Sequence, residues 1–543
     1  MKKPGAGRNG FAQPEGLFAV IITLVIVWGH VHFWRHAGGF WRDEVNSINV
    51  ASSHSLPAMA HDSFPVLTPL LLHGWLSLGG GNSDLALRTF GLLVGLAIPI
   101  VLWLAAWQTR RTFPLIGLTL VGMNTTLIVF GDSIRAYGLG SLLMASAVAV
   151  ACLHLQRPTW RRAAWLAISF TLSVQALYHN AVLVAAVCVG GWAVCRRRKT
   201  WLPAWQILGA GIIAALSLLP YVPLVRAGRE TAIVLRTGID WSHLRERFVN
   251  VLGFPTAAYL YVWIALVLVV IVFAVVAVRR RKEMEPAADE TDISLFAAAT
   301  LAAGIVFFSL FLLLASLPSQ SWYLLPFLAL AAVCLDLAWP RLPGIGRAIF
   351  LGCAALTALL STLSLARDLD YHMTNVDLWG KKLSTEAAPE DYVVVVPWFC
   401  GLSFERYFKA STPWDTVPPL ADHATHRYDL VRAQLQDTNA MAPVFEKMDR
   451  ALQSGHRVWV LAMYGLMDVP APGTAAPASP PPAPLASTGW LDTPYVLAWD
   501  SQVGHHLGDH SRQFKRMDNP TAGESFAEGM ELFMAEGWRP AAP

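Results

Sequence analysis

Two adjacent carboxylates, Asp43 and Glu44, follow directly after the first long apolar segment of the chain. Carboxylates at the edge of a membrane are costly unless water or a binding site surrounds them. Such a pair can take a proton from a hydroxyl group, or orient that group, while an electron-deficient sugar carbon develops beside it. Two solvated loop acids are the plainer interpretation, and the dipeptide alone does not decide between them.

Other residues whose side chains could bind a substrate lie near the ends of apolar segments, where a chain leaves a membrane. Among them, guanidinium groups can bind a phosphate through two parallel hydrogen bonds. Tyrosine and histidine can donate or accept hydrogen bonds beside such a phosphate. Residues of these types at such positions include Arg88, Arg135, Tyr137, His179 and Tyr323, and His61 and Asp62 lie in the loop after the first apolar segment.

The composition indicates which kind of scaffold must position these residues. Of 543 residues, 55% are hydrophobic and 14% are charged, whereas a soluble domain has about 25% charged residues. Many apolar runs reach the ~20 residues that a spanning helix needs, so the protein is expected to be a polytopic membrane protein. The net charge of +4 does not indicate nucleic-acid binding, because the basic residues cluster at the ends of apolar runs. The six cysteines show no metal or redox spacing.

About eleven apolar segments are expected to cross the membrane as helices. Each inner turn carries Lys or Arg, and the positive-inside rule therefore places the N-terminus in the cytoplasm and the C-terminus outside. This predicts a multi-pass protein of the cell (inner) membrane. The expected spans are residues 17–34, 85–107, 113–130, 137–155, 163–177, 181–194, 202–225, 257–278, 293–317, 321–339 and 348–365.

The expected domain organisation has three parts. Residues 1–16 form a cytoplasmic N-terminus, and residues 17–365 form the transmembrane domain, with a catalytic first outer loop at 35–84. Residues 366–543 form a small extracytoplasmic α/β domain, which carries a Pro/Ala-rich loop at 469–486.

Within this last part, strands and helices are expected to alternate. The apolar runs at 391–397 and 456–462 predict buried strands. Residues 427–436 and 442–453 are expected to form helices. Strands that alternate with helices predict a small α/β layer.

The order of the motifs resembles the GT-C glycosyltransferases, in the branch of the protein mannosyltransferases and the lipid A aminoarabinose transferases. Asp43-Glu44 follows the first span and Arg88 opens the second, as in that family. Arg135-Ala-Tyr137-Gly-Leu is similar to the family's Arg-x-Tyr-x-Leu. Tyr178-His179-Asn180 is similar to its Tyr-Thr-His turn, and Trp322-Tyr323-Leu-Leu-Pro to its Arg-Tyr-Leu-Leu-Pro segment.

The resemblance covers residues 17–340 well and the tail loosely. It implies a GT-C fold and the transfer of a sugar from a polyprenyl-phosphate donor to a lipid, glycan or protein acceptor. Asp43 then acts as the base or orients the acceptor, Glu44 supports it, and Arg135 holds the phosphate. The further substrate-binding residues that the resemblance implies are His61, Asp62, Arg88, Tyr137, His179 and Tyr323. Two departures stand out. Trp322 replaces the family's Arg, and the acid before Arg135 is Asp132 rather than the adjacent residue.

The outer loop at 226–254 has an excess of arginine that opposes the positive-inside trend. Its arginines are candidates for holding a polyprenyl-phosphate head group, Arg245 and Arg247 above all. The alternative is an amphipathic helix in the membrane interface, whose arginines meet lipid head groups. The apolar face of that helix would hold Trp241, Leu244, Phe248 and Leu252.

Metal binding and transport are the remaining alternatives. No cofactor is firmly predicted, although His61, Asp62 and His179 could ligate a divalent ion. The group of His505, His506, Asp509 and His510 is interpreted as a solvated loop. A transporter or lipid flippase without transferase chemistry would carry charged residues inside its spans, and Asp336 is one of few.

Overall fold

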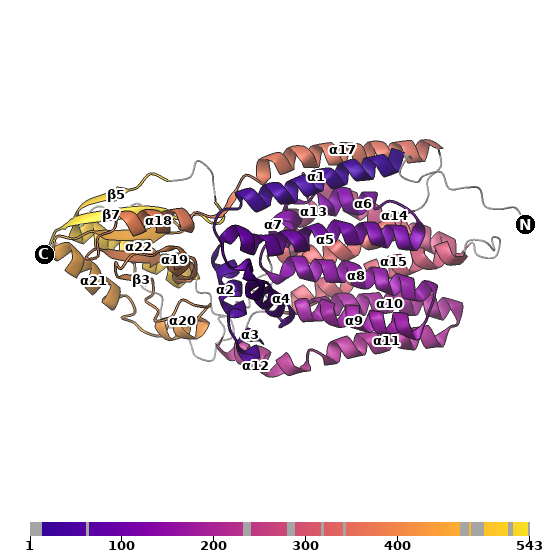
Figure 1. Ribbon diagram of the computed structural model, residues 1–543, viewed down its shortest axis with the longest axis horizontal. Coiled ribbons are helices and arrows are strands. Elements are labelled where there is room, and N and C mark those ends of the chain that lie inside the picture. The colour runs from indigo at the N-terminus through magenta and orange to yellow at the C-terminus, as the bar shows by residue number, and fades with distance from the viewer. Residues whose placement is uncertain are drawn as a thin grey trace, which may run out of the picture. The chain divides into compact units, whose positions relative to one another are not determined.

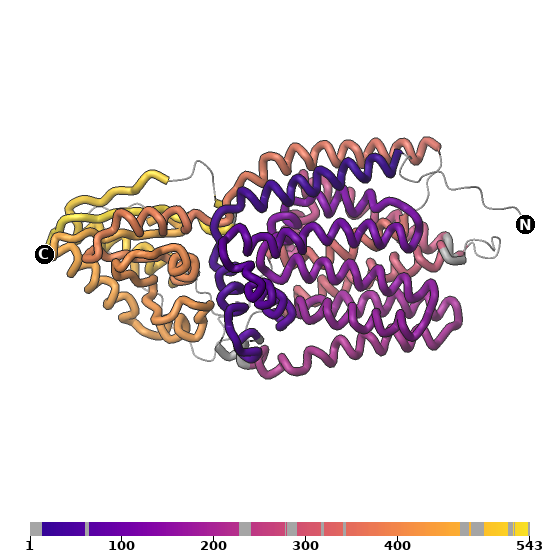
Figure 2. The backbone as a smooth tube through the Cα atoms, viewed as in Figure 1, coloured from indigo at the N-terminus to yellow at the C-terminus, as the bar shows by residue number. Residues whose placement is uncertain are grey.

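The chain forms two compact units (Figure 1). The helical unit comprises Met1–Arg35, His54–Val222 and Gly238–Leu369, and the sheet unit comprises His36–Ser53, Pro223–Thr237 and Asp370–Pro543. Figure 2 follows the chain through both units. The computed structural model describes residues 14–60, 64–231, 241–279, 288–315, 320–339, 344–466, 477–478, 493–519 and 525–540.

Nine helices of the described residues are long and apolar enough to cross a membrane. This finding confirms the predicted polytopic helical architecture. These helices are α1 (Pro14–His36), α5 (Asp84–Arg110), α8 (Ala136–Gln156), α10 (Asn180–Arg198), α11 (Trp201–Leu216) with its continuation to Arg226, α14 (Tyr259–Arg279), α15 (Ala288–Ala315), α16 (Leu325–Ala338) with the preceding 3-10 turn from Ser321, and α17 (Gly344–Asp368).

Two of the expected spans differ from the prediction. The segment 113–130 is broken into α6 (Leu115–Gly117), a π-helical turn at Leu118–Gly122 and α7 (Thr125–Gly131). Asn124 causes the break before α7, because its side chain accepts a hydrogen bond from the Leu127 amide at 3.3 Å. The segment 163–177 is helical as α9 (Trp160–Ala176) but has 17 residues. At 1.5 Å per residue it is shorter than the ~30 Å apolar core of a bilayer.

Close packing joins the middle of α10, the helix that follows His179, to α15. A Cβ atom added at Gly190 of α10 would lie 2.0 Å from Thr300 Oγ1 of α15. Only glycine therefore permits the two helices to approach this closely, as small residues do in membrane helix pairs. This contact holds α10, whose first residue follows His179, against α15.

Asp336 has a structural role in the helical unit. It lies on α16, and its carboxylate accepts hydrogen bonds from the backbone amides of Ile116 at 3.0 Å and Gly117 at 2.9 Å. These amides are the first donors of a short helix, which otherwise lack partners. The one acid that a transporter interpretation singled out is therefore satisfied by a helix end.

The sheet unit is built on a five-stranded sheet of order β3-β2-β4-β7-β5. The predicted buried strands are confirmed as β2 (Tyr392–Val396) and β4 (Val458–Ala462), which pair in parallel. β3 (Trp414–Thr416) lies parallel to β2. β7 (Glu531–Trp538) is antiparallel to both β4 and β5 (Ser511–Arg516).

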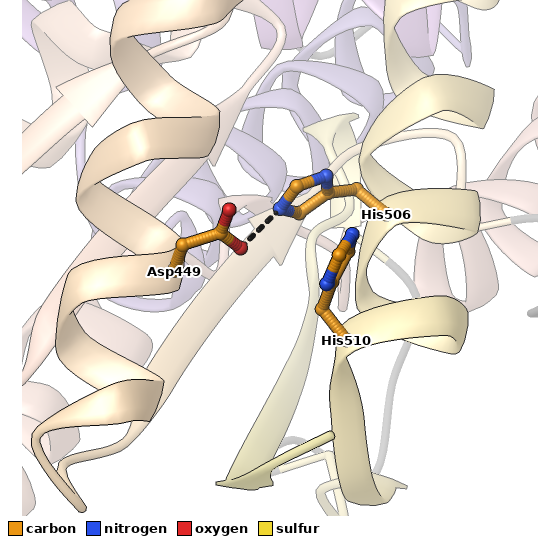
Figure 3. Close-up of side chains that lie close together, drawn as sticks. All are labelled: Asp449, His506 and His510. Atoms are coloured by element: carbon orange, nitrogen blue, oxygen red, sulfur yellow. Dashed lines mark hydrogen bonds and ion pairs between the residues drawn. The ribbon is translucent and has the colours of Figure 1, made fainter. Parts of the chain in front are cut away.

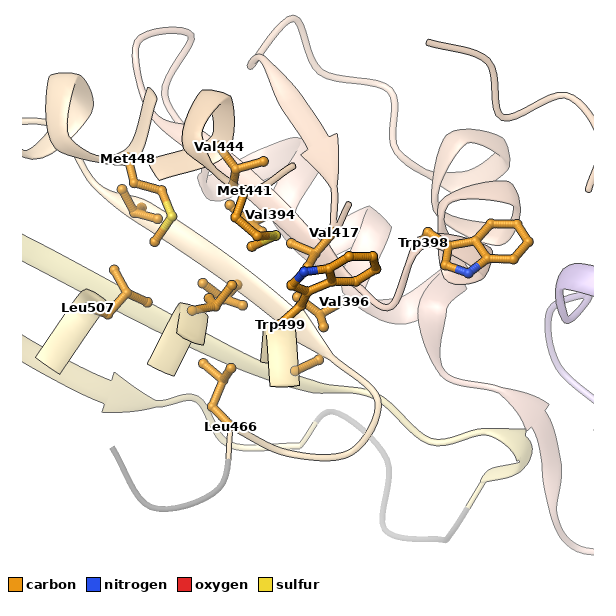
Figure 4. Close-up of a cluster of buried hydrophobic side chains, with 14 of the residues drawn as sticks. Val394, Val396, Trp398, Val417, Met441, Val444, Met448, Leu466, Trp499 and Leu507 are labelled. Carbon is orange, nitrogen blue, oxygen red and sulfur yellow. The ribbon is translucent and has the colours of Figure 1, made fainter. Parts of the chain in front are cut away.

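Both faces of this sheet are covered, which explains the continuous apolar runs in its central strands. Tyr392, Val394 and Val396 point into one core cluster, and Val393 and Val395 point into another. Figure 4 shows the first cluster with Trp499 and Leu507 of α22 (Thr493–His510) packed against the strand. The other helices of the unit are α18 (Val376–Glu386), α19 (Gly401–Tyr407), α20 (Tyr428–Gln434) and α21 (Ala442–Gln453).

The residues just after the first long helix belong to the sheet unit. The Met373 amide donates to the Ala37 carbonyl at 2.8 Å, and Gly38 bridges to Thr374 of β1 (His372–Thr374). The Phe40 amide donates to the Tyr407 hydroxyl at 2.7 Å. The first outer loop, taken from the sequence as one piece of the transmembrane domain, is thus divided after Ser53 between the two units.

The interpretation of residues 505–510 as a solvated loop is wrong. These residues form the last turns of α22, and the side chains of His506 and His510 are half-buried. The expected Pro/Ala-rich loop at 469–486 lies outside the described residues, apart from Pro477 and Ala478.

Candidate active site

The acidic pair Asp43-Glu44 lies in the first turn of α2 (Arg42–Ala51), where carboxylates interact favourably with the helix dipole. The two side chains differ in exposure. The Asp43 side chain is 22% exposed, whereas Glu44 is fully buried. Asp43 can therefore meet a substrate, while Glu44 can act only through its neighbours.

His426 is a partner of Asp43 that sequence reasoning missed. Its Nε2 lies 3.2 Å from Asp43 Oδ1. Its backbone amide donates to Asn46 Oδ1 at 3.0 Å, so a second residue of α2 holds the backbone that carries the imidazole. The ring also stacks on Tyr428, with centroids 5.6 Å apart. Asp43 thus has a partner whose position is set by several contacts.

Arg42 anchors α2 from the other side of the acidic pair. Its amide and its guanidinium both donate to Glu528 Oε1, at 3.0 and 3.3 Å. The guanidinium lies over the Phe399 ring, 4.3 Å from its centroid. Burial raises the pKa of Glu528, and the charge of Arg42 acts in the opposite direction. Neither His426 nor Glu528 carries a local sequence signal, because they lie 383 and 486 residues from their partners.

In the helical unit, four of the predicted residues are joined through aromatic contacts. Arg135 is buried at the N-terminus of α8, and its guanidinium lies 4.4 Å from the Phe64 ring centroid. The Phe64 ring meets Tyr137 edge-on at 5.4 Å, and Tyr137 lies 5.7 Å from Tyr323. Tyr323 in turn lies 6.3 Å from His179.

This group, named the Arg135 cluster, consists of Phe64, Arg135, Tyr137, His179 and Tyr323. Its members come from four separate stretches of sequence, and the sequence singled out all except Phe64. Cation–π contact with an aromatic face stabilises a buried guanidinium. The cluster therefore presents one cation and several polar ring atoms within an apolar wall.

Trp322, which stands where the resembling family has Arg, also joins this wall. Its ring lies 4.3 Å from that of Phe130 and 6.4 Å from that of Tyr137. An aromatic side chain therefore fills this position, and Arg135 supplies the charge beside it.

Asp132, three residues before Arg135, pairs with a different residue. Its carboxylate lies 2.7 and 2.9 Å from His30 Nδ1, and both side chains are almost fully buried. A Cβ atom added at Gly91 of α5 would lie 1.8 Å from the Asp132 carbonyl oxygen. The glycine thus lets this turn pack directly on α5. Arg88 is buried on the same helix and adds an electrostatic interaction with Asp132.

The two predicted loop arginines lie on α13 (Trp241–Leu252), with Arg245 exposed and Arg247 partly exposed. The Arg247 guanidinium is 4.0 Å from Glu246. The opposite face of α13 is buried through Leu244, Val251 and Leu252, and Trp241 is exposed. The helix is therefore amphipathic, as the interfacial alternative requires, with its arginines outside the packed face.

The remaining predictions concern metal ligands. His61 and Asp62 lie outside the described residues. His179 is half-buried, and its ring lies 5.9 Å from that of Phe308 and 6.3 Å from that of Phe311. Among the described residues, one group of three could hold a metal ion, and it is Asp449, His506 and His510 of the sheet unit.

Comparison with known proteins gives structural likeness only. No family model and no curated protein matches the sequence. The oligosaccharyltransferase of Archaeoglobus fulgidus, solved with a tethered acceptor peptide, is 11% identical, with a TM-score of 0.47 over 84% of this chain and 70% of that chain. ArnT from Cupriavidus metallidurans, solved with undecaprenyl phosphate, is 14% identical, with a TM-score of 0.48 over 82% of this chain and 92% of that chain. Values this low identify neither a family nor an activity.

Proposed function

We propose that this protein is a GT-C glycosyltransferase. It transfers a sugar from a polyprenyl-phosphate donor to a lipid, glycan or protein acceptor on the outer face of the membrane. The Arg135 cluster is the observation that supports the proposal most. Residues that were chosen from separate sequence motifs lie in one group, with a buried guanidinium among rings.

The cluster suits the donor because a phosphate head group needs a cation and its lipid needs an apolar wall. A guanidinium binds phosphate oxygens through two parallel hydrogen bonds. In our proposal Arg135 holds the phosphate and stabilises the charge that develops as it leaves. Tyr137, His179 and Tyr323 bind the sugar or the phosphate beside it, and Arg88, Arg245 and Arg247 provide further positive charge.

Asp43 suits the reaction itself. In our proposal it takes the proton of the acceptor hydroxyl, or orients that hydroxyl, during an inverting displacement at the sugar carbon. His426 is a positioning residue that holds the Asp43 carboxylate, and buried Glu44 supports the turn. His61 and Asp62 are proposed to bind substrate in the same outer loop.

A lipid flippase or transporter is the second candidate, and it predicts no covalent product. The test is mass spectrometry of cell-envelope glycolipids and glycoproteins from cells that have the protein, lack it, or contain Asp43→Asn. We expect one glycosylated product to disappear without the protein and to stay absent with Asp43→Asn. Asp437→Asn removes an exposed acid of the same unit and is the matched control, which should restore the product. Full product from Asp43→Asn cells would contradict the transferase mechanism.

The proposed orientation places residues 1–16 in the cytoplasm and the sheet unit outside the cell (inner) membrane. Single cysteines at Ser384 and Thr200 in a cysteine-free background test it. An impermeant thiol reagent should label Ser384→Cys in intact cells and Thr200→Cys only after lysis. Labelling of Thr200→Cys in intact cells would overturn the orientation of the first half of the chain.

A further inference from the structure

Two histidines and an aspartate of the sheet unit meet where α21 and α22 pack together (Figure 3). His506 and His510 are four residues apart on α22, so both lie on one face of that helix. Asp449 reaches them from α21. One donor atom from each of the three residues lies within 4.8 Å of the other two. This arrangement is independent of the proposed transferase residues.

The three side chains are held in place before any ion binds. His506 stacks on Phe445 of α21, with centroids 4.4 Å apart and planes at 9°. His510 stacks on Trp538, with centroids 5.0 Å apart and planes at 20°. His506 Nε2 and Asp449 Oδ1 form a hydrogen bond of 2.7 Å. Aromatic contacts on both rings therefore fix the direction in which their nitrogens point.

A second observation points to a missing ligand. Within the described part of the chain, Nδ1 of His510 is buried and has no hydrogen-bond partner. A buried polar atom without a partner costs about 1–3 kcal/mol, so native structures rarely leave one. A metal ion bound by this imidazole at Nδ1 would remove that cost. The His506 side chain is 14% exposed and that of Asp449 is 28% exposed, which leaves an entry path for an ion.

We propose that Asp449, His506 and His510 form a zinc site that links α21 to α22. Imidazole nitrogen and carboxylate oxygen are the donors that zinc prefers, and two histidines at positions i and i+4 are a common zinc-binding arrangement. Tetrahedral ligands at ~2.1 Å hold neighbouring donor atoms roughly 3.4 Å apart. The hydrogen-bonded pair has to open only slightly, and water completes the fourth position.

Binding replaces the proton between Asp449 and His506 by the metal ion, and this proton leaves to solvent. No bond of the substrate changes, and the site is a structural one. The ion would tie α22 to α21, and both helices pack against the central sheet.

The test uses the full chain in detergent, purified through a tag without histidine and stripped with a chelator. Co²⁺ serves as the probe, because its visible absorption reports ligand type and coordination geometry. We expect one Co²⁺ per chain with a tetrahedral spectrum, which Zn²⁺ displaces. His506→Gln and His510→Gln should each weaken binding by at least about tenfold. His505→Gln changes the adjacent histidine of the same helix and is the matched control, which should bind like the wild type.

Asp449→Cys provides a test based on a gained signal, which a loss of folded protein could not imitate. If position 449 ligates the ion, this variant binds Co²⁺ and adds a thiolate-to-cobalt absorption band that the wild type lacks. Two results would overturn the site. One is wild-type affinity for Co²⁺ no greater than that of His510→Gln, and the other is a Co²⁺ complex of Asp449→Cys without the thiolate band.

Discussion

Asp43 and Asp132 are two aspartates with histidine partners, and their environments are opposite. The Asp43 side chain is 22% exposed, and its oxygen lies 3.2 Å from His426. The Asp132 side chain is 3% exposed, and its oxygen lies 2.7 Å from His30. A carboxylate that takes a proton from a substrate must be reachable, whereas a fully buried carboxylate needs a permanent partner. In our proposal, exposure and the kind of partner, not residue type, separate the reactive acid Asp43 from the structural acid Asp132.

The largest expected effect is a loss of transfer rate when Asp43, but not Asp132, is substituted. Asp43→Asn should lower the transfer rate by ~10²–10⁴, because an amide keeps the shape of the side chain but cannot take a proton. Membrane insertion and yield should stay normal, since the side chain is partly exposed. The rate is measured with a short-chain polyprenyl-phosphate sugar and detergent-solubilised protein.

Asp132→Asn is the matched variant for this comparison. It should reduce the yield of folded protein, because the buried pair with His30 is lost, while each folded molecule retains turnover close to that of the wild type. Equal turnover losses in the two variants would show that the difference in exposure between Asp43 and Asp132 does not determine which acid takes part in the reaction.

Substitutions of Arg135 test whether the helical unit, which contains Asp132, also contributes to turnover. Arg135→Ala should lower turnover by ~10²–10³, because it removes a donor that stabilises developing charge, and it should also weaken donor binding. Arg135→Lys keeps the charge but loses the planar guanidinium that donates two parallel hydrogen bonds, so its turnover should fall less than that of Arg135→Ala. Turnover and donor affinity of both variants are measured with the same substrate.

Arg245→Ala measures the smaller contribution that our proposal gives to surrounding positive charge, since Arg245 is exposed on α13. Its turnover should fall by less than about tenfold. If both Arg135 variants behave like the wild type, the buried guanidinium serves packing against Phe64 rather than the donor.

Removal of the ion pair between Arg42 of α2 and Glu528 should lower stability. Glu528→Ala should lower the stability of the sheet unit by ~2–3 kcal/mol, because it leaves the Arg42 guanidinium without its buried carboxylate. Glu531→Ala removes a more exposed partner of Arg516 and should change stability by less than ~1 kcal/mol. Chemical unfolding in detergent measures both. Equal losses would show that burial does not distinguish these two ion pairs.

A third aspartate extends the comparison to an acid in an apolar core. Asp500 of α22 is buried, and among the described residues its Oδ1 has no hydrogen-bond partner. Burial raises the pKa of Asp500 to about 7 from its ordinary value of 3.8. The folded state therefore binds this proton more tightly than the unfolded state, and stability falls as pH rises from 3.8 towards 7.

Asp500→Asn removes this pH-dependent cost and should stabilise the protein by ~1–2 kcal/mol at pH 8, after allowance for the buried amide. The gain should be smaller at pH 5, where the folded carboxyl is still protonated. Thermal unfolding of both proteins at the two pH values measures the difference. A gain that is the same at pH 5 and pH 8 would show that the carboxyl does not titrate in this range.

Local patterns were enough to predict most of the architecture. Hydropathy and basic turns predicted the long helices, because a spanning helix needs a continuous apolar run. The apolar runs at 391–397 and 456–462 predicted β2 and β4, because a strand buried on both faces is apolar at every position. The break at Asn124 and the 17-residue α9 were missed, since one capping side chain and a few residues of length decided them.

The partners of the candidate residues were decided only by the tertiary structure. The sequence singled out Arg135, Tyr137, His179 and Tyr323 one motif at a time, and packing of separate helices joined their rings in one cluster. It could not indicate that α2 belongs to the sheet unit, or that His426 and Glu528 hold its first turn. Hydropathy and periodicity are properties of neighbouring residues, whereas a contact across hundreds of residues depends on which surfaces the folded chain brings together.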